Sequence, residues 1–164
     1  MEPLVSPGRI LVGARAADKW DAIRQLVDLF IDGGDLPQDD GDRAYKAVCD
    51  REERSSTGIG PGLAIPHGSL DGMQTEMGAL GIFREGVDFQ GLDGRLSHFV
   101  LMLLYPTEDS DRHVTNLAAA VRVLSSPGVG DRLRASEHPN EASEHLEHGG
   151  LVRRHESDDS TRAR

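Results

Sequence analysis

Residues 99–105, Phe-Val-Leu-Met-Leu-Leu-Tyr, constrain the fold of this chain more than any other segment. Successive side chains of a β-strand point to opposite faces, and here both alternating sets are apolar. A strand of this kind is expected in the middle of a sheet whose two faces are both covered. Pro106 follows the run and is expected to end the strand, because proline has no backbone N–H to donate.

Weaker strand patterns and helical patterns alternate along the rest of the chain. Apolar residues that recur every three or four positions predict helices, and short apolar runs between glycine-rich or polar segments predict strands. The predicted strands are 9–12, 63–65 and 77–83, with an extended piece at 87–89, a tight turn at 92–94 and the strand 99–105. The predicted helices are 16–31, 42–54, 112–124, 131–135 and 140–145.

This alternation predicts an α/β fold for a single domain that covers residues 1–148. We expect three layers, with a central mixed β-sheet flanked by helices on both faces. Residues 149–164 are polar and charged, and we expect them to form a disordered C-terminal tail.

The charge of the chain excludes several classes of partner. Its 164 residues include 28 acidic and 18 basic side chains, which gives a formal net charge of −10. Nucleic acids and anionic membrane surfaces both attract basic proteins, so we expect neither as a partner. No apolar run is long enough to insert into a membrane and no secretory signal is visible. With Cys49 as the single cysteine, these features predict a cytoplasmic protein.

His67 is the residue that most suggests chemistry. It follows Ala-Ile-Pro and precedes Gly68, so we expect it where a short buried strand breaks out into a loop. Ligands of α/β proteins bind at such strand ends. From the residues alone, His67 is either a functional histidine or a turn histidine bonded to a backbone carbonyl. Of the remaining histidines, His98 is read as structural or at a sheet edge, and the four in the polar C-terminal region as solvated.

The segment around His67 resembles a known signature. Residues 51–68, REERSSTGIGPGLAIPHG, closely resemble the active-site signature of the fructose/mannitol-type enzyme IIA domain. That domain belongs to the bacterial phosphoenolpyruvate-dependent sugar phosphotransferase system, and its family includes nitrogen-regulatory IIA proteins. The resemblance extends over roughly residues 5–146, through the Leu-Asp-Gly turn, the strand that ends at Pro106 and a histidine, His113, that opens a later helix.

The resemblance implies a role for each matching residue. It makes His67 the phosphoryl acceptor, and it places Arg51 as a phosphate clamp and His113 as a hydrogen-bond donor to phosphate beside it. Ser56, Thr57, Gly58 and Gly68 are expected to support the site. Histidine suits this chemistry because its neutral ring nitrogen is a nucleophile near neutral pH. Arginine suits it because its planar guanidinium pairs with two phosphate oxygens. Without the resemblance, Arg51 reads as an exposed helix arginine paired with its acidic neighbours.

Three functions are compatible with these features. The first is a phosphoryl carrier that accepts phosphate on His67 from the phosphocarrier protein HPr or a paralogue and passes it to a IIB domain for sugar uptake. The second is a nitrogen-regulatory type of protein in which phosphorylation of His67 controls binding to a regulatory target. The third is a metal- or ligand-binding domain that uses His67, His113 and His98. The first two need no metal and no cofactor, and we expect neither; we expect partners to dock on an apolar patch that includes Ile59, Leu63 and Leu70.

Overall fold

The computed structural model of the protein describes residues 4–148. The tail predicted for residues 149–164 therefore lies outside the described residues. Five strands form one sheet, and five α-helices and two short 3-10 helices, η1 (Gln38–Asp40) and η2 (Thr107–Asp109), complete the described part of the chain. The strands are β1 (Val5–Val12), β2 (Leu63–Ala64), β3 (His67–Leu70), β4 (Met77–Val87) and β5 (Ser97–Pro106).

Strand β5 lies at the centre of this sheet. It pairs antiparallel with β4 on one side, and on the other side it pairs in parallel with both β2 and β3. Strand β1 pairs in parallel with β4 and forms the far edge. The prediction of a mixed sheet with residues 99–105 as its central strand is confirmed, and Phe99 to Leu104 are all buried.

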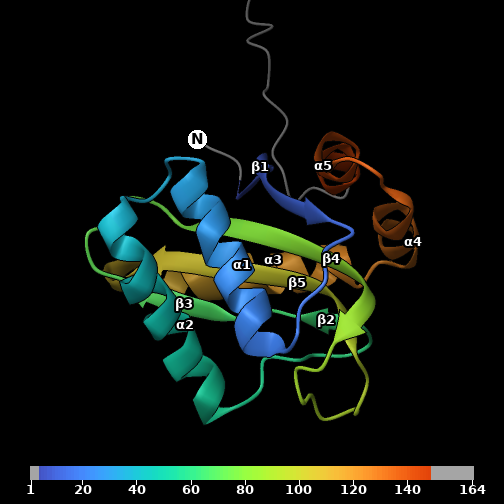
Figure 1. Cartoon of the computed structure of the whole chain (residues 1–164), viewed down its shortest axis with the longest axis horizontal. Coiled ribbons are helices and arrows are strands. Elements are labelled where there is room, and N and C mark those ends of the chain that lie inside the picture. The colour runs from blue at the N-terminus through green and yellow to red at the C-terminus, as the bar shows by residue number, and fades with distance from the viewer. Residues whose placement is uncertain (1–3, 149–164) are drawn as a thin grey trace, which may run out of the picture.

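Helices cover both faces of the sheet, as predicted. Helices α1 and α2 lie on one face, and α3 lies behind the sheet in the view of Figure 1, with α5 beside β1 and α4 packed next to α5. The helices are α1 (Lys19–Asp32), α2 (Gly41–Arg54), α3 (Ser110–Leu124), α4 (Pro127–Ala135) and α5 (Pro139–His148). None of the helices among residues 4–148 combines the length and the apolar character needed to cross a membrane.

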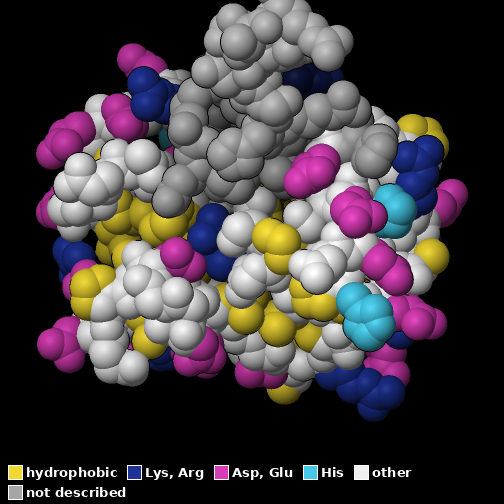
Figure 2. Space-filling view, turned by 90° about the horizontal axis from the view of Figure 1, so that it is seen from above, with side chains coloured by type: hydrophobic (Ala, Val, Ile, Leu, Met, Phe, Trp, Pro, Cys, Tyr) yellow, Lys and Arg dark blue, Asp and Glu magenta, His cyan; other side chains and the backbone are white. Residues whose placement is uncertain are grey.

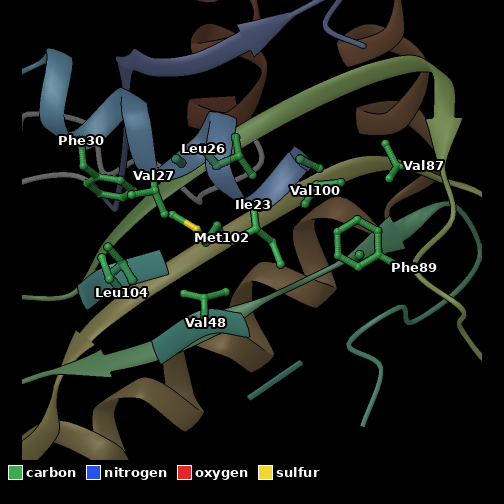
Figure 3. Packing of buried hydrophobic residues seen from close by; sticks show 14 of the residues in the cluster. Ile23, Leu26, Val27, Phe30, Val48, Val87, Phe89, Val100, Met102 and Leu104 are labelled. Carbon is green, nitrogen blue, oxygen red and sulfur yellow. The ribbon is translucent and has the colours of Figure 1, made fainter. Parts of the chain in front are cut away.

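Each face of the sheet has its own hydrophobic core. On the α1–α2 side, Val100, Met102 and Leu104 of β5 pack against the apolar stripe of α1 (Figure 3). On the other side, Leu101 and Leu103 pack with side chains from α3, α4 and α5. The alternation of the β5 side chains therefore divides them between two cores, which is why this segment is apolar at nearly every position.

Several element boundaries differ from the predicted ones for identifiable reasons. Helix α1 begins at Lys19 instead of residue 16, because the Asp18 side chain caps it by accepting a 2.8 Å hydrogen bond from the Asp21 N–H. Strand β4 continues to Val87, because Gly86, with a φ of 79°, lies within an irregular stretch of the β4–β5 pairing and does not end the strand. Strand β1 begins at Val5, and the buried Arg9 within it donates a 3.0 Å hydrogen bond to the Gly78 carbonyl.

Most charged side chains lie on the surface of the molecule. Figure 2 shows one face of the molecule, with Asp and Glu side chains spread around its edge. Most ion pairs among the described residues join exposed or half-exposed groups, such as Arg15 and Glu85 at 2.9 Å. Two pairs are instead buried on both sides: Lys19 with Glu52, and His113 with Glu76. Both lie in the region of His67.

Candidate functional site

His67 is the first residue of β3, and not, as predicted, a residue of a loop. Strands β2 and β3 pair with β5 in one continuous register, with Leu63 opposite Phe99 and His67 opposite Leu103. Ile65 and Pro66 separate the two strands. The Pro66 carbonyl still accepts a 3.0 Å hydrogen bond from the Leu103 N–H. The chain therefore stays on the sheet through the interruption and delivers a half-buried histidine at its end.

The backbone fixes which nitrogen of the His67 ring carries a proton. Nδ1 lies 3.0 Å from the carbonyl oxygen of Ile65. A carbonyl oxygen only accepts hydrogen bonds, so Nδ1 must be the N–H donor. In the neutral ring, Nε2 then holds the lone pair and is the nucleophilic atom. This carbonyl contact is the one predicted for a turn histidine, and it leaves Nε2 outside the bond to Ile65.

The surroundings of His67 favour its neutral form. Burial lowers the pKa of His67 below its ordinary value of 6.5, and repulsion from Arg51, and from His113 whenever its ring is protonated, lowers it further. The hydrogen bond to Ile65 and the charge of Glu52 oppose this shift of the pKa. The ring is therefore available as a neutral nucleophile at neutral pH.

Arg51 reaches this site because α2 packs unusually close to β3. A Cβ atom on Gly68 would lie 3.0 Å from the Val48 N and 3.1 Å from the Ala47 carbonyl carbon, so only glycine fits there. One turn after Val48, the half-buried Arg51 donates from Nη1 to the Ser55 carbonyl at 2.9 Å. The space beside Gly68 is therefore not open, because α2, the helix that carries Arg51, fills it.

His113 comes to the site from the first turn of α3. Its ring centre lies 5.0 Å from that of His67, and its ring stacks on Tyr105 at 3.9 Å with an angle of 6° between the planes. Its Nδ1 lies 2.6 Å from the Glu76 carboxylate, while its Nε2 is buried with no hydrogen-bond partner. The structure therefore brings His67, Arg51 and His113 together from β3, α2 and α3.

Polar groups of the loop 55–62 form hydrogen bonds with other groups of the protein. The Thr57 hydroxyl donates to Glu52 at 2.5 Å, and the Ser56 hydroxyl donates to the Phe89 carbonyl. The Gly58 N–H donates to the Ser56 oxygen at 3.0 Å. Glu52 is fully buried and also pairs with Lys19 at 3.3 Å. In this structure these bonds hold the loop beside the end of α2.

Glu76, Asn116 and Tyr105 also contact the site, although none of them was predicted as a site residue. Glu76 binds His113 through one oxygen and accepts from the Asn116 amide at 2.7 Å through the other. Glu76 is a lone acidic residue in the polar stretch before β4, and such a residue forms no recognisable motif. Of the three, only Tyr105 could have been predicted. It ends the strand 99–105 and so lies near the end of the sheet that carries the site.

Other predicted features lie away from the site. His98 on β5 has Nδ1 at 3.1 Å from the Phe83 and Arg84 carbonyls, as in a structural histidine. Of the C-terminal histidines, His138 is exposed, and His155 lies outside the described residues. In the predicted docking patch, Ile59 is 40% exposed. Leu63 and Leu70 are buried in the two cores, so the prediction that they take part in docking is wrong. The described residues include no group of three or more His, Cys, Asp or Glu side chains placed to hold a metal ion.

Comparison with known proteins gives consistent matches. Residues 3–149 match the family model described as "Phosphoenolpyruvate-dependent sugar phosphotransferase system, EIIA 2". The chain is 32% identical over 136 residues to a nitrogen regulatory protein of Pseudomonas aeruginosa, a match that covers 83% of this chain and 87% of that protein. It is 34% identical over 121 residues to the fructose-specific EIIA component of Haloferax volcanii, which covers 74% of this chain and 77% of that protein.

A solved structure supports the same fold. The complex of enzyme IIA mannitol with phosphorylated enzyme IIB mannitol from Escherichia coli contains a chain that matches with a TM-score of 0.72 at 23% identity. The match covers 86% of this chain and 95% of that chain. The arrangement of one mixed sheet between two helical layers is thus that of a known protein.

Proposed function

Since the chain belongs to the EIIA type 2 family of the phosphoenolpyruvate-dependent sugar phosphotransferase system, we propose that it is a phosphoryl carrier whose acceptor is Nε2 of His67. The members of this family are phosphoryl-transfer components of that system. One observation carries the assignment of the acceptor. The Nδ1 proton of His67 is committed to the Ile65 carbonyl, which leaves Nε2 as the nucleophilic atom beside Arg51 and His113.

The proposed reaction balances without any further group. The Nε2 lone pair of His67 attacks the phosphorus of a phosphohistidine on the donor protein. The N–P bond of the donor breaks, and its electron pair returns to the donor nitrogen. His67 keeps its Nδ1 proton throughout, because that proton remains bonded to the Ile65 carbonyl. The transferred group resembles metaphosphate in the transition state, so positioning and charge provide most of the catalysis.

Arg51 and His113 supply that charge. The guanidinium of Arg51 can bind two phosphoryl oxygens side by side, which a lysine cannot do. His113 contributes its buried, unpartnered Nε2 to the same region. Before phosphate arrives, the charge of Arg51 also lowers the pKa of His67. Arg51 therefore favours the neutral nucleophile first and the anionic product afterwards.

The proposed donor is a small phosphocarrier protein, HPr or a paralogue, and the proposed acceptor is a IIB domain that serves sugar uptake. The acceptor is supported by the Escherichia coli structure, in which a protein of the same fold forms a complex with phosphorylated IIB. An acidic surface suits a donor with a basic rim, because opposite charges steer two proteins together. The corrected docking surface keeps Ile59 and adds Val114, which is 64% exposed and follows His113 directly.

A labelling experiment tests the acceptor. The protein is incubated with phosphoenolpyruvate, enzyme I and HPr, and acid-labile phosphate on the chain is measured for wild type and for His67→Ala. We expect wild type to be labelled and His67→Ala to remain unlabelled; equal labelling would overturn the proposal. Arg51→Lys should slow labelling by about tenfold or more, because a point charge replaces a two-pronged donor. Arg54→Lys, in the same last turn of α2 and exposed, is the matched control and should match wild type.

A regulatory role is the second candidate, and the likeness to the nitrogen regulatory protein of Pseudomonas aeruginosa favours it. In that case phosphorylation of His67 controls which protein binds, and no IIB domain is required. Affinity capture from cell extract with wild type and His67→Ala separates the two functions. Recovery of a IIB domain as the sole specific partner would contradict regulation. A non-IIB partner that binds only one phosphorylation state would contradict the sugar relay.

A further inference from the structure

The His113 ring has a strong partner on one nitrogen and none on the other. Nδ1 lies 2.6 Å from Oε1 of Glu76, with 6% and 4% of the two side chains exposed. Nε2 is buried without a hydrogen bond. Unsatisfied buried polar atoms are rare in folded proteins and call for an explanation. The ring stands beside His67, at a centre-to-centre distance of 5.0 Å, where the proposed phosphoryl group would be bound.

Glu76 is itself fixed in place by α3. Its second oxygen, Oε2, accepts a 2.7 Å hydrogen bond from the Asn116 amide. Asn116 follows His113 by three residues, so the two side chains leave the same face of the helix. Both oxygens of Glu76 therefore accept from neighbouring positions of α3, which is the behaviour of an ionised carboxylate.

This arrangement determines where protons sit on His113. A carboxylate only accepts hydrogen bonds, so Nδ1 keeps its proton whether the ring is neutral or charged. Any second proton can bind only at Nε2, which lacks a partner. In the neutral ring Nε2 carries a lone pair, which would repel a phosphoryl oxygen. In the charged ring Nε2–H would donate to that oxygen.

We propose that Glu76, seated by Asn116, is a positioning residue that directs proton uptake to Nε2 of His113 when His67 becomes phosphorylated. This inference rests on the proposed function. Its effect passes through His113, since the hydrogen bonds of Glu76 go to His113 and Asn116 and not to His67.

The charges around the ring support coupling between phosphorylation and protonation. Groups from three segments face His113: Glu76 from the stretch before β4, His67 from β3 and Tyr105 from β5. Arg51 of α2 adds a positive charge near His67. Before phosphorylation this cation disfavours a second positive charge at the site. Afterwards the phosphoryl group offsets Arg51, and His113 lies between two anions in a buried, low-dielectric setting.

The test reads the protonation of His113 directly. The full chain is phosphorylated chemically with potassium phosphoramidate, which requires no partner protein, and His67→Ala identifies the signals that belong to the phosphorylated site. The ¹⁵N chemical shifts of both His113 ring nitrogens are then recorded at neutral pH for wild type and Glu76→Gln. Glu85→Gln, an exposed carboxylate near the other end of β4, is the matched control.

In phosphorylated wild type and Glu85→Gln we expect both His113 nitrogens to be protonated. In phosphorylated Glu76→Gln we expect a neutral ring with a single proton. We also expect the rate of transfer from HPr to fall about tenfold, in kcat and not in KM, because ground-state docking is unchanged. The proposal is overturned if Glu76→Gln retains a doubly protonated His113, or if His113 of phosphorylated wild type is neutral.

Two further measurements keep the outcome interpretable. If Glu76→Gln does not fold, Asn116→Ala replaces it, because it keeps the charge but frees the carboxylate; an unchanged His113 signature in this variant would overturn the proposal. In the unphosphorylated protein, the neutral His113 ring should carry its proton on Nδ1 in wild type and on either nitrogen in Glu76→Gln. This measurement of the His113 tautomer does not require phosphorylation of His67. A failure of the inference about Glu76 can therefore be distinguished from a failure of the acceptor assignment, which labelling with HPr tests.

Discussion

At the scale of single residues, His67 combines a fixed proton with a depressed basicity. The Ile65 carbonyl holds the Nδ1 proton, and burial lowers the pKa of the ring. The first effect selects the reacting atom, and the second keeps that atom unprotonated. Neither effect uses a catalytic side chain, so the acceptor is prepared by the backbone and by the packing around it.

The pH dependence of His67 follows from this shift. The unfolded chain protonates His67 near 6.5, whereas the folded chain protonates it only at lower pH. Between these two values the unfolded state binds more protons, so this contribution to stability is present above 6.5 and is lost as pH falls through the folded pKa. We expect an NMR titration of His67 to have its midpoint below 6.5. Arg51→Met should raise this midpoint, because one of the charges that lowers the pKa is removed; a wild-type midpoint above 6.5 would contradict the account.

Part of this site could be predicted from the sequence and part could not. Arg51, His67 and His113 could be predicted because their neighbours form a long signature or open a helix. Glu76 and Asn116 could not be predicted in this way. Asn116 is only three residues from His113, but Glu76 is 37 residues away in the sequence. Glu76 contacts both residues only when α3 packs beside the end of β5. A carboxylate in a polar stretch gives no pattern of its own. Its role depends on a tertiary contact.

At the scale of elements, the contact between α2 and β3 places Arg51. Gly68 lets the two backbones approach to a distance that any Cβ atom would block. The sequence predicted α2 almost to the residue, because its apolar stripe is regular. It did not predict β3 as a strand, because the four residues His-Gly-Ser-Leu carry no strand pattern and gain their pairing from β5.

We expect Gly68→Ala to lower the free energy of unfolding by about 1–3 kcal/mol, because the new methyl group would press on backbone atoms that cannot rotate away. Urea denaturation measures the change. Gly8→Ala is the control, since nothing lies within 4 Å of a Cβ at Gly8, and it should be nearly neutral. A Gly68→Ala variant as stable as wild type would mean that α2 can move away from β3 without penalty.

The two lysines of the chain offer a matched pair of substitutions. Lys19 pairs with Glu52, and their side chains are 8% and 0% exposed, whereas Lys46 pairs with Asp50 on the exposed face of α2. We expect Lys19→Met to destabilise the fold by about 3 kcal/mol, because it leaves Glu52 buried without its cation. Lys46→Met should leave the urea midpoint unchanged, as removal of exposed pairs usually does. Equal midpoints for the two variants would contradict the buried role of Lys19.

At the scale of the whole molecule, the net charge of −10 is the dominant property outside the site. The scarcity of lysine and the excess of acidic residues suit a salt-rich environment. Like charges on a compact surface repel one another, and salt screens that repulsion over about 10 Å at 0.1 M. The fold should therefore gain stability as salt is added.

We expect the Tm to rise steadily with added KCl. A variant in which the exposed Asp28, Asp32 and Asp39 are all changed to Asn should respond less, because less repulsion remains to be screened. Differential scanning calorimetry at several KCl concentrations makes the comparison. A Tm that falls with salt, or an identical response in the triple variant, would show that attractive ion pairs outweigh the repulsion.

The two-residue interruption between β2 and β3 affects how this protein can vary. The group that orients His67 is the carbonyl of Ile65, and every amino acid has a carbonyl. Substitution at position 65 can therefore change packing but cannot remove the acceptor of the Nδ1 proton. Only a change in chain length between Ala64 and His67 would shift that carbonyl out of reach. Drift in side-chain identity leaves the choice of reacting nitrogen untouched, whereas a single insertion or deletion there would abolish it.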